Sequence, residues 1–327
     1  MATGTHAREI DQREFEAYRR ELTGYCYRML GSGSEAEDAV QETMLRAWRS
    51  ADGLAERAAM RSWLYRIATN VCLDMLQAAQ RRARPMDLAS PLSAESALGP
   101  ELPETTWIQP IADARVMPET GDPAELAAAR ETIRLAFVAA LQHLPARQRA
   151  VLILREVLRW QASEVAELLG MTVASVNSAL QRARATLDTL ELHDTGGAAV
   201  GAEHEELLAR YVDTFQRYDI EALVSLIAED ATFTMPPYRL WLRGTADISR
   251  WYVGQGIGCK GSRLLATWAN GCPAFGAYKP SPNGGWEPFA LQVIEVAGDK
   301  LVGLHHFLGP ALFEEFGLPP RLEADAA

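Results

Sequence analysis

Residues 144–187 read LPARQRAVLILREVLRWQASEVAELLGMTVASVNSALQRARATL, and this stretch decides the fold of the first half of the chain. Apolar residues at helical spacing predict a short helix that ends at Gly170, because glycine readily accepts the positive φ found at helix ends. A second helix is predicted to begin after Thr172, whose hydroxyl can cap the first backbone N–H groups. Two helices joined by a glycine turn predict a DNA-binding helix-turn-helix.

The second predicted helix has one apolar face and one face of small and polar side chains. Small side chains let a backbone approach base edges, while Gln181 can pair with bases and Arg182 and Arg184 can bond guanine or phosphate. An ordinary solvated helical hairpin is the alternative. The expected apolar positions are Val173, Val176, Leu180, Ala183 and Leu187. The candidate DNA contacts are Thr172, Ala174, Ser175, Ser178, Gln181, Arg182 and Arg184.

Residues 57–84 form a second basic segment, RAAMRSWLYRIATNVCLDMLQAAQRRAR, with six arginines against the single acid Asp74. That imbalance suits a polyanion. Trp63 and Tyr65 lie among the arginines, and aromatic rings beside cations can hold the unstacked bases of a melted strand. Core packing is the competing interpretation of both rings. The better candidates for solvent or nucleic acid are Asn70, Arg81 and Arg82.

These segments resemble a known family. Residues 35–48, EAEDAVQETMLRAW, are followed by RSWLYRIATN and then by LPARQRAVLILRE with its helix-turn-helix. This order resembles bacterial sigma factors of the extracytoplasmic-function group over residues of about 12–84 and 125–190. The resemblance implies a sigma-2 domain that docks on core RNA polymerase and opens the minus-10 element. It also implies a sigma-4 domain whose helix-turn-helix reads the minus-35 element.

The resemblance also assigns individual residues of the first block. On the helix expected over residues 35–48, Val40, Met44, Ala47 and Trp48 should face inward, which leaves polar groups for a basic partner surface. A solvated helix face is the alternative. The implied polymerase contacts are Asp38, Gln41, Glu42, Leu45 and Arg46. The implied minus-10 contacts, with the loop over residues 50–60, are Arg61, Ser62, Trp63, Tyr65, Arg66, Asn70, Arg81 and Arg82.

The sequence departs from the family pattern in two places. Typical members carry a basic residue where Asn177 and Ala179 stand, and a denser basic tract where residues 77–80 stand. We therefore expect fewer phosphate contacts, weaker binding to free DNA and greater reliance on polymerase.

Between the two blocks, residues 85–122 hold six prolines and seven acids against the single base Arg115. This composition predicts an extended, mobile linker. In the family the corresponding linker threads through polymerase, and Trp107, Ile108 and Pro110 are candidates for anchoring it. A passive tether is the alternative.

A Gly/Ala hinge over residues 195–201 is followed by a further domain. Helical periodicity is expected over residues 203–218, 220–227, 245–253 and 310–316. Alternation predicts strands over residues 231–235, 263–269, 274–278, 288–296 and 301–307, with a hairpin turn at Asn283-Gly284. This order resembles the SnoaL-like, nuclear-transport-factor-like cone. In related sigma factors such an appendage is implied to replace a separate anti-sigma protein as a built-in regulator.

The SnoaL-like fold also includes enzymes, so acids and histidines of this domain were weighed as a catalytic site. Asp219 is interpreted as a helix N-cap and Asp230 as a loop acid before a strand. His305 and His306 are adjacent in a strand, so their side chains point to opposite faces and cannot act as one dyad. We therefore expect no enzyme. A ligand pocket, with core packing as the alternative, is assigned to Phe233, Trp241, Trp251, Trp268 and His305.

The 327 residues, of which 48% are hydrophobic, can support two or three domains with real cores. The net charge of −11 reflects acids in the linker and tails, whereas both basic blocks are rich in arginine. Four cysteines without a CxxC motif give no zinc pattern, and we expect reduced thiols with a redox pair of Cys259 and Cys272 as an alternative. We expect neither a signal peptide nor a membrane span.

The sequence thus predicts a multidomain chain, with two all-α sigma domains and a C-terminal α+β SnoaL-like cone. The expected segments are sigma-2 (1–84), linker (85–122), sigma-4 (123–194), hinge (195–202) and regulatory domain (203–327). We expect a cytoplasmic sigma factor without cofactor or metal, with core polymerase and promoter DNA as partners and no required anti-sigma factor. The alternatives are a free-standing helix-turn-helix regulator and a DNA-binding protein with a ligand-binding or enzymatic SnoaL-like domain.

Overall fold

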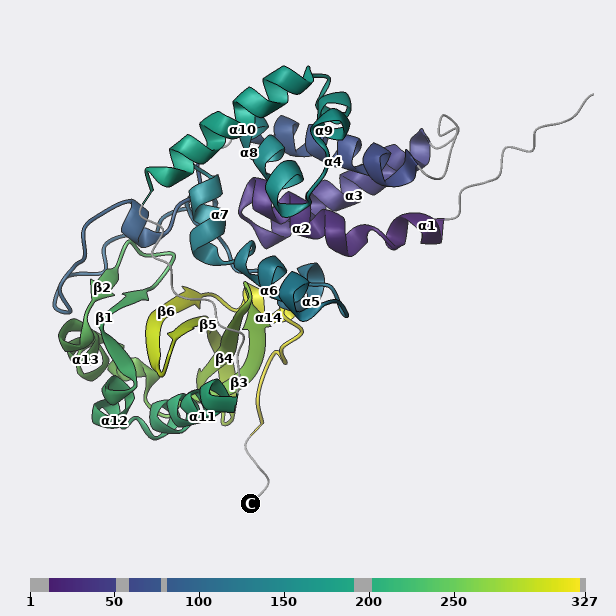
Figure 1. Ribbon diagram of the computed structural model, residues 1–327. Helices are drawn as coiled ribbons and strands as arrows, with labels where there is room; N and C mark the ends of the chain where they lie inside the picture. Colours follow the sequence, from purple (N-terminus) through teal and green to yellow (C-terminus); the bar gives the residue numbers. More distant parts are fainter. Residues whose placement is uncertain (1–11, 51–58, 78–80, 191–201, 324–327) are drawn as a thin grey trace, which may run out of the picture. The chain divides into compact units, whose positions relative to one another are not determined.

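The computed structural model describes residues 12–50, 59–77, 81–190 and 202–323 (Figure 1). By their internal contacts the residues form two compact units. The helical unit comprises residues 1–81, 115–121 and 137–191, and the sheet unit comprises residues 82–114, 122–136 and 192–327. Most of the predicted loop over residues 50–60 and of the predicted hinge lies outside the described residues.

The first part of the helical unit contains α1 (Gln12–Glu16), α2 (Arg19–Leu30), α3 (Gly33–Arg49) and α4 (Met60–Leu76). Helix α2 ends at Gly31, which has a φ of 74°, and the Ser32 hydroxyl then caps α3 by accepting from the Glu35 N–H. Helices α2, α3 and α4 pack against one another. A 2.7 Å hydrogen bond between the buried hydroxyls of Tyr25 and Thr69 joins α2 to α4.

The second part of the helical unit is the helix-turn-helix. It contains most of α7 (Leu135–Leu141), then α8 (Ala146–Leu152), a π-helical turn (Ile153–Val157), α9 (Ala162–Leu169) and α10 (Val173–Asp188). The predicted caps are confirmed, since Gly170 has a φ of 62° and the Thr172 hydroxyl accepts from the Ser175 N–H at 3.1 Å. The apolar face is buried at Val176, Leu180 and Ala183. The inward placement of Val173 is wrong, because this first residue of α10 is 44% exposed.

The sheet unit is built on one six-stranded sheet with the order β2-β1-β6-β5-β4-β3. Its strands are β1 (Ile227–Thr234), β2 (Trp241–Arg243), β3 (Arg263–Ala269), β4 (Cys272–Pro280), β5 (Trp286–Ala297) and β6 (Lys300–Leu308). All neighbouring strands are antiparallel except β1 and β6, which are parallel. Four predicted strands are confirmed within three residues at either end, and the Asn283-Gly284 turn joins β4 to β5. Strand β2 was not predicted.

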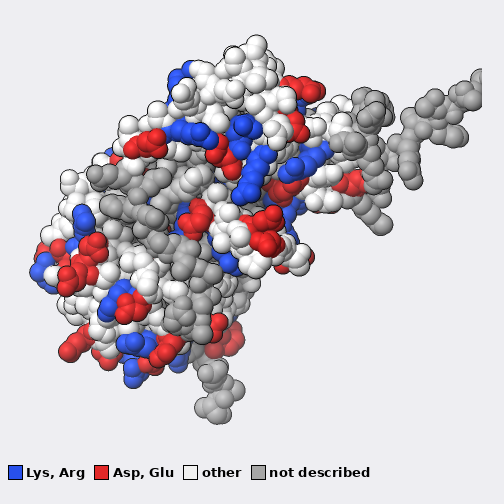
Figure 2. Space-filling model, in the orientation of Figure 1, with Lys and Arg blue, Asp and Glu red and all other residues white. Residues whose placement is uncertain are grey.

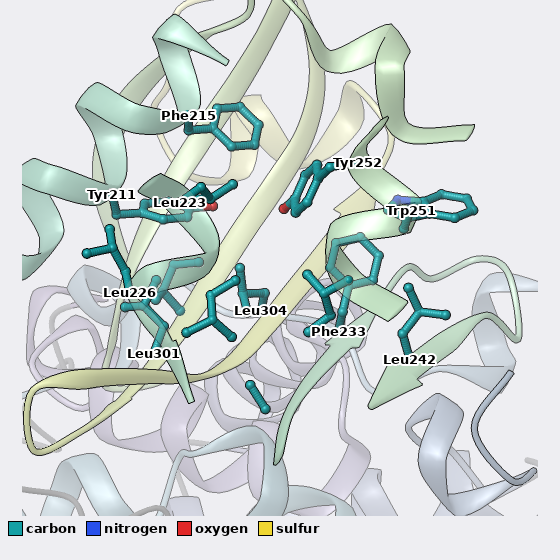
Figure 3. Close-up of a cluster of buried hydrophobic side chains, with 14 of the residues drawn as sticks. Tyr211, Phe215, Leu223, Leu226, Phe233, Leu242, Trp251, Tyr252, Leu301 and Leu304 are labelled. Atoms are coloured by element: carbon teal, nitrogen blue, oxygen red, sulfur yellow. The ribbon is translucent and has the colours of Figure 1, made fainter. Parts of the chain in front are cut away.

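Three helices, α11 (Ala202–Arg217), α12 (Ile220–Ser225) and α13 (Thr245–Val253), line the inner face of the curved sheet (Figure 1). Large apolar side chains from these helices and from β1 and β6 fill the space between them, as Figure 3 shows for Tyr211, Phe215, Phe233, Tyr252 and Leu304. Asp219 caps α12 by accepting from the Ala222 N–H, as predicted. Asp230 lies inside β1, so its placement in a loop is wrong.

The outer face of the sheet is covered by α14 (Ala311–Glu315) with the following turn, and by the linker. Gly276 of β4 leaves room for this packing, because a Cβ at this position would lie 2.7 Å from the Leu318 side chain and 3.0 Å from the Phe313 ring. The Thr234 and His305 side chains also lie on this face, beside linker residues Arg84 and Ile108.

The linker packs against the C-terminal domain, where the sequence predicted an extended, mobile segment. The Leu92 N–H donates to the Trp241 carbonyl at 2.9 Å, the Leu102 N–H donates to the Pro237 carbonyl at 3.0 Å, and the Trp241 indole donates to the Ala89 carbonyl at 2.8 Å. Ala94 is buried in the core of the sheet unit. Linker backbone groups thus pair with the C-terminal strands and turns instead of water, which fixes the segment in place.

The far end of the linker is held by the turn between β3 and β4. Asn270, fully buried at a φ of 56°, donates its backbone N–H to the Ile111 carbonyl and accepts the Ile111 N–H with its side-chain oxygen at 3.0 Å. Its side-chain amide donates to the Ile133 carbonyl at 2.7 Å. The Gly271 N–H donates to Asp113 at 2.8 Å, and burial raises the pKa of that carboxyl to about 6. One turn therefore binds two segments that flank residues 114–132.

The cysteines are free thiols. Cys272 begins β4, whereas Cys259 lies near Lys279 at the other end of that strand, so the alternative redox pair is wrong. Cys26 and Cys72 instead lie together in the core between α2 and α4, where their hydrogen bond and burial raise the pKa of the Cys72 thiol. Among the described residues, no helix combines the length and apolar character needed to cross a membrane.

Candidate polymerase and nucleic-acid interfaces

One face of α3 presents polar and apolar groups to solvent. Asp38, Gln41 and Leu45 are exposed, while Glu42 and Arg46 are half-buried and form an ion pair of 2.7 Å. Because these residues are spaced at three or four positions, they share one side of the helix. The predicted polymerase contacts therefore lie on a single accessible face.

A groove of about 420 Å³ runs beside this face and is lined by α1, the start of α2 and α3. Leu45 and Trp48 line it with 48% and 66% of their surface exposed. The inward placement of Trp48 is therefore wrong. The helix already buries Ala36, Ala39, Val40, Thr43 and Ala47 against α2 and α4, and residue 48 turns away from that contact. An exposed tryptophan beside an exposed leucine is an apolar surface typical of a protein interface.

The predicted minus-10 contacts divide into accessible and buried residues. Ser62 and Trp63 are half-buried. Tyr65 is fully buried, as the core-packing alternative has it, and burial raises the pKa of its phenol. Arg82 is also buried and donates to the Glu104 and Trp107 carbonyls, so its placement toward solvent is wrong. The exposed members of the set are Arg61, Arg66, Asn70 and Arg81.

The recognition face of α10 is accessible along its length. Its exposed residues are Thr172, Ala174, Ser175, Ser178, Gln181, Arg182 and Arg184. Arg182 donates to the Ser178 hydroxyl at 2.8 Å, and Arg184 pairs with Glu156 at 2.6 Å. The first contact holds the Arg182 guanidinium on the face that small side chains leave open for close approach to a base pair, whereas Arg184 is engaged by an acid.

The two departures from the family pattern on α10 are not equivalent in space. Asn177 is exposed, whereas Ala179 is 3% exposed and packs in the helix-turn-helix core. The absence of a basic side chain at 179 therefore removes no phosphate contact from the exposed face. On the view in Figure 2, blue basic groups over the helical unit alternate with red acidic groups. Arg66, for example, lies 3.6 Å from Glu167.

The residues assigned to a ligand pocket do not converge on one cavity. Phe233 and Trp251 belong to the inner core, where their ring centroids are 6.1 Å apart. Trp241 packs against the linker, and Trp268 is 41% exposed on the edge strand β3. His305 faces the outer side of the sheet, where Thr234 lies at 3.0 Å and buried Glu295 at 3.5 Å.

The two histidines lie on opposite faces, as predicted, and their environments differ. His306 faces the inner core beside Phe233, and burial lowers its pKa to about 3. On the outer face, His305, Arg84 and Arg134 keep the pKa of Glu295 below its usual value, although burial alone would raise it. The side chains of His305 and Glu295 lie beneath the linker and are directed at each other instead of at an open cavity.

Two residues that the sequence did not single out connect the sigma-2-like and sigma-4-like parts of the helical unit. Arg149 of α8 is buried and donates to the Met29 carbonyl at the end of α2. Trp160, in the turn before α9, packs on Tyr65 of α4. Both residues lie within residues 144–187. Their partners are 120 and 95 positions away along the chain, and no local sequence pattern indicates contacts at such distances.

Comparison with known proteins decides the family. Residues 15–82 match Sigma-70 region 2 and residues 134–187 match Sigma-70 region 4. The ECF RNA polymerase sigma factor SigG of Mycobacterium tuberculosis H37Rv is 43% identical over 311 residues, which cover 94% of this chain and 83% of SigG. The chain belongs to the extracytoplasmic-function (ECF) sigma factors. It is a sigma factor of RNA polymerase, and its partners are the core enzyme and promoter DNA.

A second relative covers the whole architecture. The ECF sigma factor SigJ of M. tuberculosis H37Rv is 29% identical over 320 residues, which cover 94% of this chain and 95% of SigJ. The crystal structure of M. tuberculosis SigJ superimposes with a TM-score of 0.60 at 24% identity, covering 94% of this chain and all of that chain. The predicted fold class, with helical sigma domains before a C-terminal sheet domain, is confirmed.

Proposed function

We propose that this ECF sigma factor binds core polymerase through α3 and the groove beside it. The observation that carries this proposal is the exposed pair Leu45 and Trp48, which flanks the polar face of Asp38, Gln41 and Glu42. Aromatic anchors of this kind contribute most of the binding free energy at protein interfaces. The carboxylates around them suit a basic partner surface.

Trp48→Ala tests this assignment. We expect core-polymerase affinity to fall about thirtyfold, which corresponds to a hot-spot loss of about 2 kcal/mol. Val253→Ala, which truncates a 61% exposed apolar residue of the sheet unit, is the matched control and should bind as the unchanged chain does. Size-exclusion co-elution followed by titration gives both affinities. Equal affinities of the two variants would remove Trp48 from the interface.

We further propose that α10 reads the minus-35 element and that the exposed α4 residues Arg61, Arg66 and Asn70 meet the minus-10 strand. In support, all seven assigned residues, namely the N-cap Thr172 and six residues of α10, are exposed. Arginine and glutamine side chains on such a face can make specific hydrogen bonds in the major groove.

The C-terminal domain, residues 203–327, is proposed to regulate initiation by holding the linker. In support, the N–H groups of Leu92, Leu102 and Ile111 donate to this domain, and the Asp113 carboxyl accepts from the Gly271 N–H. A held linker has fewer accessible conformations than a free one. Holding it therefore restricts the positions that sigma-2 and sigma-4 can take on polymerase. This role requires neither a separate anti-sigma factor nor catalysis.

The regulatory proposal is tested by transcription from one promoter with core polymerase and either the full chain or a chain ending at Thr195. Different promoter activity, at equal core occupancy, is expected. Equal activity would defeat the regulatory role and leave the sigma function intact. A free-standing helix-turn-helix regulator is not favoured, because the chain belongs to the sigma family. Since polymerase is in the cytoplasm, we place the protein there, and we assign it no enzymatic activity.

A further inference from the structure

Trp160 occupies a slot on α4 in the helical unit. Its ring centroid lies 5.0 Å from that of Tyr65, at an interplanar angle of 59°. The Arg61 guanidinium carbon lies 5.4 Å from the centroids of both rings. Trp160 and Tyr65 are 6% and 0% exposed. The indole is therefore enclosed by an aromatic ring and a cation.

An aromatic ring beside an arginine is the chemistry that binds an unstacked nucleobase. We propose that Tyr65 and Arg61 form a base-binding slot for single-stranded DNA, and that Trp160 occupies this slot in the free chain as a substitute for the base. The inference rests on the proposed role of α4 at the minus-10 element. It also explains how a buried tyrosine can contact DNA, since the ring is covered by a side chain that can be displaced.

The polar edge of Trp160 supports displacement. Its indole N–H is buried and has no hydrogen-bond partner among the described residues. Buried tryptophans usually pair this group, because an unpaired buried donor is unfavourable. The indole is thus held by its contacts with the Tyr65 ring and the Arg61 guanidinium, and its departure from the slot breaks no hydrogen bond of its N–H.

The contacts between the sigma-2-like and sigma-4-like parts around the slot can also separate without leaving a buried charged group unpaired. Arg66 and Glu167 are 3.6 Å apart and both reach solvent. The buried Arg149 guanidinium donates to Met29 of the sigma-2-like part, but it also donates to Gln142 and to the Leu144 carbonyl within its own part. It therefore keeps hydrogen-bond partners when the two parts move apart, which avoids the penalty of an unpaired buried cation.

The test is binding of a short labelled oligothymidine to the full chain without polymerase, measured by fluorescence anisotropy. Trp160→Leu keeps an apolar side chain but has no ring to stack, and we expect it to bind about tenfold tighter, as removal of a stacked competitor predicts. Trp160→Phe keeps a ring and should bind as the unchanged chain does. Trp268→Ala, which removes an exposed tryptophan of the sheet unit, is the control for general effects.

Adding Tyr65→Ala to Trp160→Leu should abolish the gain, because the second face of the slot is then missing. Unchanged binding by Trp160→Leu, with cooperative unfolding retained, would overturn the proposal. A gain that persists without Tyr65 would overturn it as well. Permanganate reactivity of promoter thymines with polymerase and Tyr65→Ala tests the role of α4 separately. If Tyr65→Ala prevents promoter opening but Trp160→Leu does not bind oligothymidine more tightly, the role of α4 stands. The proposal that Trp160 occupies the slot is then refuted.

Discussion

The turn at Asn270 offers a sharp test of how the linker is held. Asn270→Ala removes the oxygen that accepts the Ile111 N–H and the amide that donates to the Ile133 carbonyl. Both backbone partners lie in buried surroundings, and each unsatisfied group costs about 1–3 kcal/mol. The φ of 56° adds about 1 kcal/mol for alanine, which lacks the local hydrogen bonding of asparagine in this region. The expected loss is about 3–7 kcal/mol.

Asn270→Gly separates the two causes. Glycine loses the same two hydrogen bonds but accepts the positive φ without strain, so we expect it to be about 1 kcal/mol more stable than the alanine variant. The exposed Asn283→Ala, in the turn between β4 and β5, is the matched control and should stay within about 0.5 kcal/mol of the unchanged chain.

Hydrogen exchange, measured on the peptide that covers residues 105–114, shows whether the linker opens locally. Urea unfolding gives the total loss in the free energy of unfolding. A loss of about 3 kcal/mol corresponds to roughly hundredfold faster exchange where the linker opens locally. Unchanged exchange in this peptide, or a loss below about 1 kcal/mol for Asn270→Ala, would refute the conclusion that this turn anchors the linker.

Three further outcomes follow from single residues. Thr172→Ala should cost about 1 kcal/mol of helix-turn-helix stability in thermal unfolding, whereas Thr172→Ser should be near neutral, because both hydroxyls can cap α10. Arg182→Ala should weaken holoenzyme binding to a promoter by about tenfold, as loss of one good base contact predicts, in a gel-shift titration where the exposed Arg210→Ala has no effect. The pKa of Asp113 is raised by burial to about 6, so the protonated form is favoured on folding and its stabilisation is lost as the pH rises through 6. Exchange of residues 105–114 should therefore be slower at pH 5 than at pH 7.5 after correction for intrinsic rates, and Asp113→Asn should remove that difference; a pH response that survives in the asparagine variant would assign it to another group.

The features that the sequence predicted are those encoded locally. Gly170, Thr172 and Asp219 act within three or four residues of their partners, so their capping roles could be inferred before any fold was known. Strands β3 to β6 follow from alternation and a hairpin turn in the same way. Family resemblance supplied what local signals do not, namely which helix faces polymerase and which faces DNA.

What the sequence did not predict depends on partners far along the chain. The parallel pairing of β1 with β6 joins residues about seventy positions apart, and the three-residue β2 is too short to show alternation. Trp48 follows the helical period of an inward residue, yet α3 contacts its neighbours along a narrower stripe. Trp160 and Tyr65 meet across 95 positions, which no periodicity reports.

The linker shows why a disorder-like composition need not produce disorder. Six prolines lower its demand for hydrogen-bond acceptors, because proline has no N–H, and they reduce the conformational freedom that ordering removes. The N–H groups of Leu92, Leu102 and Ile111 find acceptors in the C-terminal domain. Removal of that domain would therefore alter the linker as well. Substitutions at Asn270, which leave the domain in place, are the cleaner way to ask whether holding the linker controls the sigma factor.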